Sequence, residues 1–473
     1  MFRGCLKRGG PLFFYLCTMN TGDTICAVAT PNGTGAISVV RVSGPEALAA
    51  VDTLFAKDLK NAASHTIHFG NLVNTAGELI DEVLVSVFQH GKSFTGEESV
   101  EISCHASPYI VQQILLALSQ KGCRQAEPGE FTLRAFMNGK LDLSQAEAVA
   151  DLIAAQTKNA HDIALNQLKG HFSTKLKELR EKLIHFASLV ELELDFAEED
   201  VEFADRTELK ALVTEVLDKI RTMIHSFELG NAIKHGVPVA IVGAPNTGKS
   251  TLLNQLLGEE RAIVSNIAGT TRDVIEETLN IDGILFRLID TAGIRETSEE
   301  IEAMGIERSR EKIRASKIVL CMADMTVEGN PESVVKWAEQ LTVSYPDKKV
   351  IVVGNKCDIS QNTIENCDLP HVLLAAKSGM NIDNLKMLLA ELVLGNADLT
   401  DQVIVSNTRH LEALMRTEEA LERALIGLQT GISADFVAMD IRAAMRSLGN
   451  ITGEIEVDTD ILGNIFSRFC IGK

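Results

Sequence analysis

The spacing of apolar and polar positions changes along the chain, and each change predicts a different kind of structure. Residues 19–138 carry short apolar runs typical of strands, interleaved with segments of helical spacing and separated by glycine-containing turns. The expected strands are 24–29, 36–42, 82–88 and 99–103, and the expected helices are 45–56 and 108–121. This part is therefore predicted to be a mixed α/β domain.

Residues 139–235 have apolar positions three and four apart, which predicts amphipathic helices. Ser144 is expected to cap one of them, because Glu147 follows at the spacing of a capping box. The acidic stretch 191–205 is expected to be a solvated helix end and turn rather than a metal site. Helical spacing returns over residues 396–473, so two separated segments would form one all-α domain.

Between those helical segments, residues 236–395 alternate apolar strands with helices, as in a doubly wound, mostly parallel sheet. The expected strands are 238–242, 274–281, 284–290, 317–323, 349–353 and 371–374. A compact domain can be inserted into another, since insertion requires only that its two ends lie near each other. The pattern therefore predicts a multidomain protein in which an α/β domain interrupts a helical one.

Residues 1–18 stand apart from this pattern, with a basic start and a short apolar run over Pro11–Cys17. A secretory signal is one interpretation, but no convincing small-residue cleavage site follows the apolar run. We expect instead a disordered extension, or an incorrectly assigned start with Met19 as the initiator.

Composition narrows the class of protein. The chain has 473 residues, enough for about three domains, and no apolar run long enough for a transmembrane helix, so we expect no membrane insertion. Its nine cysteines show no metal-ligand spacing, which favours reduced thiols in the cytoplasm. The formal net charge of −20 argues against a nucleic-acid coat over the whole surface but allows a local basic patch.

The stretch with the clearest chemistry is Gly243–Ser250, which reads GAPNTGKS and lies between an apolar run and a helix-compatible segment. Strand, glycine-bracketed loop and helix are the context of a phosphate-binding P-loop. Its backbone N–H groups would wrap phosphate oxygens, Lys249 would reach the β- and γ-phosphates, and the Ser250 hydroxyl would ligate Mg²⁺. The alternative is a glycine-rich turn that binds nothing.

Four later motifs follow in the order that GTPases require. Gly269–Asp273 (GTTRD) would be a switch loop, and Asp290–Gly293 (DTAG) would hold the metal through water and sense the γ-phosphate. Asn355–Asp358 (NKCD) would read guanine: Asp358 accepts both base N–H groups, Asn355 holds the loop and N7, and the Lys356 stem covers the ring. Ala375–Lys377 (AAK) would offer a backbone N–H to guanine O6. The sequence therefore predicts GTP binding.

The position that carries a water-orienting glutamine in Ras-like GTPases is Ile294, so another group must position the water. Arg295 and Glu302 are the candidates from the residues alone. The expected catalytic residues are Lys249, Thr271, Asp290 and Glu302. The residues expected at GTP are Asn246, Thr247, Gly248, Lys249, Ser250, Thr251, Ser265, Asn266, Ile267, Ala268, Gly269, Thr270, Thr271, Asp290, Thr291, Ala292, Gly293, Asn355, Lys356, Asp358, Ala375, Ala376 and Lys377.

Taken with four further motifs, these residues resemble the MnmE (TrmE) family of tRNA-modification GTPases over residues 19–473. The further motifs are Ser93–Glu97 (SFTGE), Pro128–Phe131 (PGEF), Gly139–Glu147 (GKLDLSQAE) and the terminal Phe469–Lys473 (FCIGK). The resemblance implies an N-terminal folate-binding domain that dimerises (19–138), a helical domain in two segments (139–235 and 396–473) and a G domain inserted between them (236–395).

The resemblance also implies ligands. The folate-pocket positions of the family fall on Arg41, Glu101, Lys140 and Lys473, for 5-formyl- or 5,10-methylene-tetrahydrofolate. Its activating K⁺ would be bound by Asn246, Ser265, Ile267 and Thr270, and its Mg²⁺ by Ser250 and Thr271. The water-positioning glutamate of the family matches Glu302, and Cys470 matches a cysteine with a possible role in the modification.

The function implied is that of a cytoplasmic, homodimeric, K⁺-activated GTPase that acts with the FAD-containing flavoprotein MnmG (GidA) in a heterotetramer. Together they would add an aminomethyl or carboxymethylaminomethyl group at C5 of the wobble uridine, position 34, of certain tRNAs. Two alternatives from other classes stay open: a regulatory GTPase switch in ribosome assembly or signalling, and a stand-alone folate enzyme.

Overall fold

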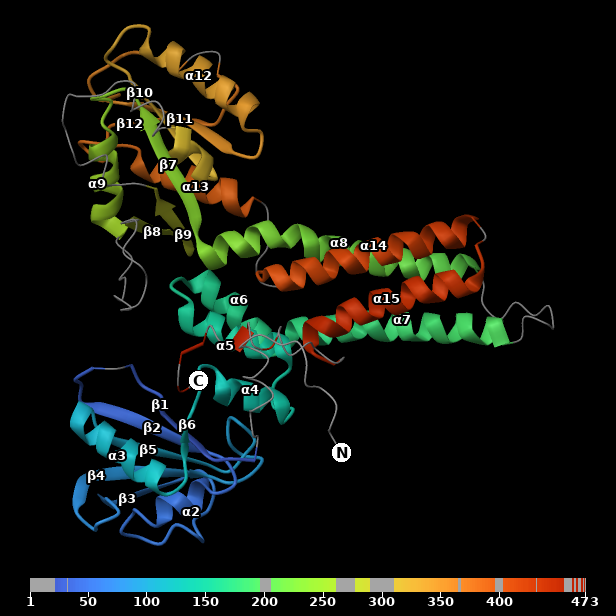
Figure 1. Ribbon diagram of the computed structural model, residues 1–473. Helices are drawn as coiled ribbons and strands as arrows, with labels where there is room; N and C mark the ends of the chain where they lie inside the picture. Colours follow the sequence, from blue (N-terminus) through green and yellow to red (C-terminus); the bar gives the residue numbers. More distant parts are fainter. Residues whose placement is uncertain are drawn as a thin grey trace, which may run out of the picture. The chain divides into compact units, whose positions relative to one another are not determined.

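The computed structural model describes residues 22–31, 33–195, 206–260, 277–289, 310–364, 367–395, 403–430, 432–454, 462, 465, 466, 469, 470 and 472. Contacts within the chain divide it into two compact units, each of which combines a β-sheet with helices (Figure 1). The first contains Met1–Ile153, Asn166–Val213 and Glu419–Lys473, and the second contains Ala154–Leu165 and Thr214–Glu418. Both units therefore draw on segments that lie far apart in the sequence.

The first unit holds a six-stranded sheet in the order β3-β4-β5-β2-β1-β6. Neighbouring strands are antiparallel except β1 and β6. The strands are β1 (Ile25–Val28), β2 (Ile37–Ser43), β3 (Thr66–Val73), β4 (Leu79–Phe88), β5 (Ser99–His105) and β6 (Arg124–Gln125), and the helices of this α/β part are α2 (Ala47–Asp52), α3 (Pro108–Gln120) and α4 (Glu130–Met137). The predicted strands and helices of this part are confirmed, whereas β3, β6 and α4 were not predicted.

The two faces of this sheet differ. One face is buried against α2 and α3, with β-branched residues of the strands facing helix residues such as Val51 and Leu118. On the other face, Phe131 of α4 packs against Ile25 and Ala27 of β1. The strands farther from α4 expose large apolar side chains, namely Ile37, Ile67, Phe69 and Leu84.

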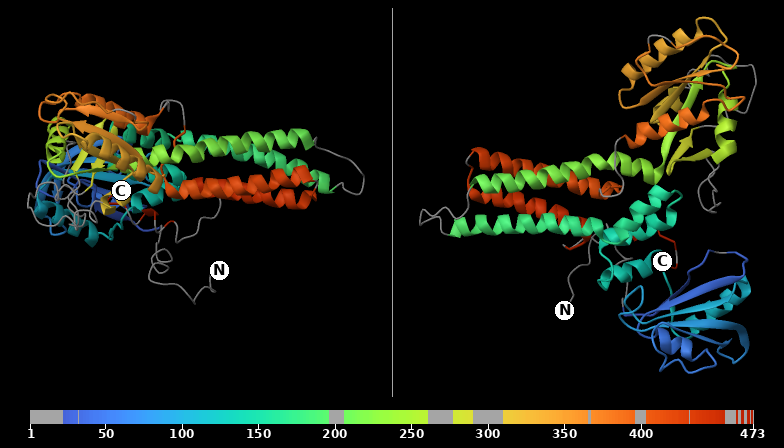
Figure 2. Two further views of the ribbon diagram at one scale, coloured as in Figure 1. Left: turned by 90° about the horizontal axis from the view of Figure 1, so that it is seen from above. Right: turned by 180° about the vertical axis from the view of Figure 1, so that it is seen from behind.

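Long helices form the rest of the first unit, where α7 (His171–Asp195) and α15 (Ala434–Thr452) lie side by side although they are far apart in the sequence (Figure 2). Arg180 of α7 forms an ion pair with Glu454 just beyond α15. Helix α5 (Leu143–Ala154) also belongs to the first unit. Helices α6 (Lys158–Leu168) and α8 (Arg206–His235) lie mostly in the second unit, and α14 (Thr408–Thr430) is divided between the two. No helix in the described part of the chain is long and apolar enough to cross a membrane.

The predicted helix cap at Ser144 is wrong by two residues. Helix α5 already begins at Leu143, and the Asp142 carboxylate accepts the Gln145 backbone N–H at 2.9 Å. The Gln145 side chain accepts the Asp142 backbone N–H in return, also at 2.9 Å. Asp142 and Gln145 therefore form the reciprocal capping pair, because the aspartate offers the same cap one position before the helix.

The second unit holds a six-stranded sheet in the order β12-β11-β10-β7-β9-β8, parallel except for the β8–β9 hairpin. Its strands are β7 (Val237–Gly243), β8 (Glu277–Ile281), β9 (Ile284–Leu288), β10 (Ile318–Asp324), β11 (Lys349–Asn355) and β12 (His371–Leu374). Helices α9 (Lys249–Glu260) and α13 (Ile382–Leu394) cover one face, and α12 (Asn330–Ser344) covers the other (Figure 1). The predicted doubly wound, mostly parallel sheet is confirmed.

Candidate functional site

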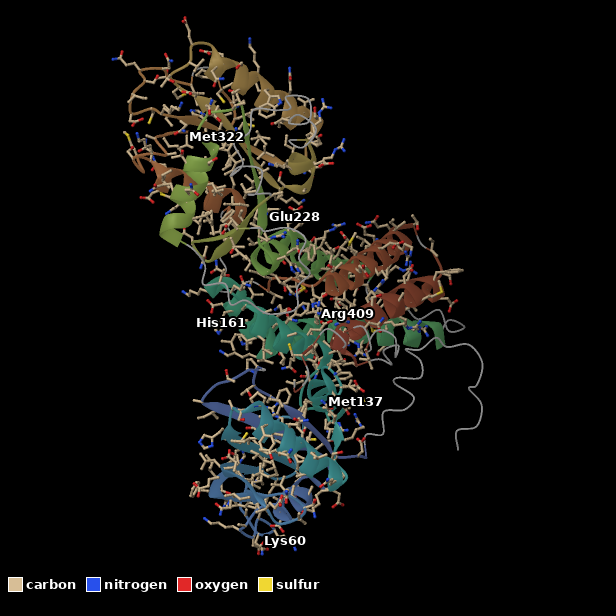
Figure 3. All side chains as sticks on the ribbon, turned by 60° about the vertical axis from the view of Figure 1, so that its left-hand side comes forward. Lys60, Met137, His161, Glu228, Met322 and Arg409 are labelled. Atoms are coloured by element: carbon tan, nitrogen blue, oxygen red, sulfur yellow. The ribbon has the colours of Figure 1, made fainter. Side chains whose placement is uncertain are left out.

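The loop between β7 and α9 has a backbone that only small residues allow. Gly243 has φ +153°, and a Cβ there would lie 2.7 Å from the Met322 carbonyl oxygen; Met322 is labelled in Figure 3 within the core of the sheet. Gly248 has φ +97°, and a Cβ there would lie 2.1 Å from the Asn355 side-chain nitrogen. Both glycines are therefore required by close approach of neighbouring strands, as well as by their dihedral angles.

Lys249 folds back over this loop. Its Nζ donates to the Gly243 carbonyl at 2.9 Å and to the Ala244 carbonyl at 2.7 Å. Burial, and secondarily the charge of Lys312, lower the pKa of Lys249. Within the described part of the chain, no protein group accepts a hydrogen bond from the backbone N–H of residues 246, 247 or 248. A row of such donors beside an ammonium group and a helix N-terminus is suited to an anion.

Asn355 links this loop to the neighbouring strand ends. Its Nδ2 donates to the Thr247 carbonyl at 2.8 Å, and its Oδ1 accepts the Ala376 backbone N–H at 2.9 Å. All three residues are buried. Asn355 therefore holds the P-loop by one hydrogen bond and braces the 375–377 segment by another, a contact that the sequence did not reveal.

Two neighbours of Asn355 differ in environment. Asp358 is exposed, and no hydrogen-bond partner of its carboxylate occurs among the described residues. Lys356 has φ +66° and places its Nζ 2.5 Å from Asp324 Oδ2 at the end of β10. Burial alone would raise the pKa of Asp324, but hydrogen bonds from Lys356 and Thr326 hold it below its ordinary value. The ammonium group of Lys356 is thus held by Asp324, whereas the carboxylate of Asp358 is open to a ligand.

The structure brings together the predicted nucleotide residues that it describes, around the carboxyl ends of β7 and β11, where ligands bind in open α/β sheets. Thr251 lies on α9 with Lys249 and Ser250. The remaining predicted residues lie outside the described ones, namely Ser265, Asn266, Ile267, Ala268, Gly269, Thr270, Thr271, Asp290, Thr291, Ala292, Gly293, Ile294, Arg295, Glu302 and, at the terminus, Lys473.

A second candidate site lies on the sheet of the first unit, where Arg41 and Glu101 are opposite each other on β2 and β5. Arg41 Nε donates to Glu101 Oε1 at 2.9 Å, and its NH1 reaches the Gly472 carbonyl at 3.5 Å. The guanidinium carbon lies over two aromatic rings, 5.7 Å from the centroid of Phe94 and 5.6 Å from that of Phe131. Three of the predicted folate-site segments thus meet at one place.

The loop that carries Phe94 is fixed by buried hydroxyls. Ser43 Oγ is 2.7 Å from Thr95 Oγ1 and donates to Glu97 Oε2 at 2.8 Å. Lys140, the remaining described folate-pocket position, donates to the Gly91 carbonyl at the start of the same loop at 3.0 Å. The predicted pocket residues Arg41, Glu101 and Lys140 therefore all border or support this loop.

A buried ionic cluster beneath α4 was missed by the sequence analysis. Arg134, 3% exposed, binds Asp23 at 2.6 Å, Glu130 at 2.9 Å and Glu97 at 3.3 Å. Arg124 binds Asp23 and Glu130 as well. Although burial opposes ionisation, the hydrogen bonds from the two arginines lower the pKa of Asp23 and of Glu130. No local pattern reveals this cluster, because Asp23 lies 101 residues from Arg124 and 111 from Arg134.

The cysteines divide by exposure. Cys470, in the candidate tail motif, is exposed, whereas Cys26, Cys104, Cys123 and Cys321 are buried. Burial raises the pKa of Cys26 and Cys321 to about 12 and that of Cys104 and Cys123 to about 11. These buried thiols are therefore unreactive at neutral pH, and Cys470 is accessible.

A P-loop at the end of β7 and an NKxD motif at the end of β11, bridged by Asn355, define the class of P-loop guanine-nucleotide-binding proteins. Residues 24–140 match the family model "GTP-binding protein TrmE N-terminus", and residues 143–470 match the "MnmE helical domain". The chain belongs to the MnmE (TrmE) family.

Relatives match along nearly the whole chain. It is 49% identical over 464 residues to the tRNA modification GTPase MnmE of Flavobacterium johnsoniae, covering 95% of this chain and 99% of the relative. It is 49% identical over 459 residues to the protein of that name from Cytophaga hutchinsonii, covering 96% and 98%. The corresponding protein of Parabacteroides distasonis is 48% identical over 463 residues, covering 95% and 100%.

Proposed function

We propose that this protein is a GTPase that takes part in modifying C5 of the wobble uridine in certain tRNAs. The main support is the pair of hydrogen bonds that the Asn355 side chain makes with the backbone of Thr247 and Ala376. They join the P-loop, the NKxD motif and the 375–377 segment, which are three loops of a guanine-nucleotide site. Relatives 48–49% identical over nearly full length bear the name tRNA modification GTPase. GTP hydrolysis would drive a conformational cycle, and the uridine chemistry would take place at a separate site.

At the nucleotide site, Lys249 would exchange its two carbonyl acceptors for the β- and γ-phosphates, which are stronger acceptors. Ser250 and Thr271 would hold Mg²⁺, which neutralises charge on the phosphates, and Asp290 would act through the metal's water. Glu302 would position the attacking water in place of the glutamine of Ras-like proteins. Asp358 would accept the two guanine N–H groups, since its carboxylate is exposed and has no partner in the described chain.

A K⁺ ion would fit beside Asn246, with Ser265, Ile267 and Thr270 as its other ligands. Asn246 is exposed, and within the described part of the chain its side-chain oxygen has no hydrogen-bond donor. The ion would supply positive charge between the β- and γ-phosphates. GTP hydrolysis should be faster in KCl than in NaCl, and Asn246→Ala should abolish that difference while GDP binding persists. Equal rates of the unaltered protein in both salts would contradict the proposal.

A one-carbon tetrahydrofolate would fit the second site. Arg41 and Glu101 present a guanidinium and a carboxylate, whose side chains are 23% and 29% exposed. Lys140 and Lys473 are the other residues we assign there, and the folate would supply the one-carbon unit. Cys470 would take part in the modification itself. Titration with 5-formyltetrahydrofolate should give saturable binding that Glu101→Ala weakens at least tenfold. Absence of binding would favour the alternative, a regulatory GTPase switch without a modification activity.

The assembly would be a cytoplasmic homodimer that binds the FAD-containing flavoprotein MnmG in a heterotetramer. We assign dimerisation to the N-terminal domain, 19–138, whose outward sheet face exposes Ile67, Phe69 and Leu84. Residues 236–395 would be the G domain, inserted between helical segments 139–235 and 396–473. An exposed apolar face of this kind is suited to a protein interface.

A further inference from the structure

The carboxylate of Asp324 is held in place by hydrogen bonds within the protein. Its Oδ1 accepts the Thr326 backbone N–H at 3.0 Å and the Thr326 hydroxyl at 2.6 Å. Its own backbone N–H donates to Asn330 Oδ1 at 2.8 Å. Oδ2 remains for Lys356, whose Nζ lies 2.5 Å away. The short turn after β10 thus aims one carboxylate oxygen at the lysine of the NKxD motif.

Lys356 is restrained at its backbone too. Its φ of +66° is a left-handed conformation that a lysine adopts only when its surroundings impose it. On either side, the Asn355 carbonyl accepts the Met325 N–H at 3.0 Å, and the Cys357 N–H donates to Leu374 at 3.2 Å. Asp324 and Asn355 are also direct neighbours in the β10–β11 register. The stem of Lys356 is therefore fixed at both its ends.

We propose that Asp324 is a positioning residue that holds the Lys356 stem against the face of the bound purine and so sets how long a guanine nucleotide stays bound. The inference rests on the proposed guanine site. A lysine side chain is flexible, and packing it on a ligand ordinarily costs rotamer freedom. The ion pair with Asp324 already restricts the rotamers of Lys356 within the protein. Preorganisation of this kind slows dissociation of the nucleotide. Asp358 determines which base binds, whereas Asp324 acts on any purine.

Dissociation of a fluorescent GDP analogue from the full chain tests the proposal. Asp324→Ala should raise the dissociation rate about tenfold, and Lys356→Met, which keeps the stem but loses the ammonium, should have a similar effect. The double variant should be no faster than either single one, because both remove the same interaction. Thr326→Val is the matched control: it removes a hydrogen bond to the same carboxylate, leaves the ion pair, and should change the rate less than about twofold.

Two results would overturn the inference: an effect of Asp324→Ala no larger than that of Thr326→Val, or effects of Asp324→Ala and Lys356→Met that multiply in the double variant. If Asp324→Ala does not fold, Asp324→Asn removes the charge at nearly constant size and is expected to give the same acceleration.

A different experiment tests the proposed guanine site itself. Asp358→Asn should shift binding from GDP to XDP, and adding Asp324→Ala should then speed XDP release by the same factor. No shift in base preference by Asp358→Asn would refute the guanine site itself. A shift without any effect of Asp324→Ala would refute only the role of Asp324.

Discussion

Replacing Asn355 by alanine should destabilise the second unit as well as weaken nucleotide binding. The change removes the amide that donates to the Thr247 carbonyl and accepts the Ala376 N–H. Thr247 is 2% and Ala376 is 1% exposed, so water does not readily replace the lost partner. Two buried backbone groups are therefore left unsatisfied at once.

The expected loss in the free energy of unfolding follows from those two unsatisfied backbone groups. A buried polar group without a partner costs about 1–3 kcal/mol, so the pair should lower the free energy of unfolding by about 2–6 kcal/mol. That is a large part of the stability of a domain, which is about 5–15 kcal/mol. Nucleotide affinity should fall as well, because the P-loop and the 375–377 segment lose their common brace.

The assay uses the single tryptophan of the chain, Trp337, which lies on α12 and packs against the core of the same sheet. Urea unfolding of the nucleotide-free protein followed by its fluorescence reports this unit. Asn362→Ala is the matched control, since the exposed Asn362 makes one side-chain hydrogen bond, to Met325, at 2.7 Å. If the two variants differ by less than about 1 kcal/mol, the bridging role of Asn355 is wrong.

Three further variants or reagents test other parts of the structure. Gly248→Ala should lose nucleotide binding, measured by GDP titration, because its Cβ would lie 2.1 Å from Asn355 Nδ2 at φ +97°. Arg134→Met should cost about 3 kcal/mol at neutral pH. Although burial opposes ionisation, hydrogen bonds from the arginines lower the pKa of Glu130 in the folded state, so this stabilisation is complete above the unfolded pKa and is lost on acidification. The gap in unfolding free energy between the variant and the unaltered protein should therefore narrow as the pH falls, as read by urea unfolding followed by circular dichroism. Maleimide at pH 8 should modify Cys470 before Cys26, as read by peptide mass spectrometry.

The regular part of the fold could be predicted because it depends on local pattern. Each expected strand of the parallel sheet corresponds to an observed one, since strands buried on both faces form continuous apolar runs. Strand β3 was not predicted. Its apolar Ile67 and Phe69 are exposed whereas Gly70 is buried, so the apolar pattern of this strand does not follow burial. The cap of α5 was misplaced because Ser144 and Asp142 are both capable of the role.

The chemistry of the candidate sites was predicted only where it follows a linear motif. Lys249 and Asn355 lie where the P-loop and NKxD patterns require. The pairing of Lys356 with Asp324 and the convergence of Arg134 on Asp23 depend on contacts 32 and 111 residues apart, which no local spacing reveals. Sequence motifs therefore indicate the ligand, and the structure shows which side chains hold the motif residues in place.

The most direct test of the central proposal is nucleoside mass spectrometry of tRNA from a strain that lacks this gene. The strain would be complemented with the unaltered gene or with Lys249→Ala, which removes the P-loop ammonium. We predict that the C5-modified wobble uridine disappears on deletion and returns only with the unaltered gene. Modification that persists after deletion would contradict a role in tRNA modification, and restoration by Lys249→Ala would contradict the need for the GTPase site.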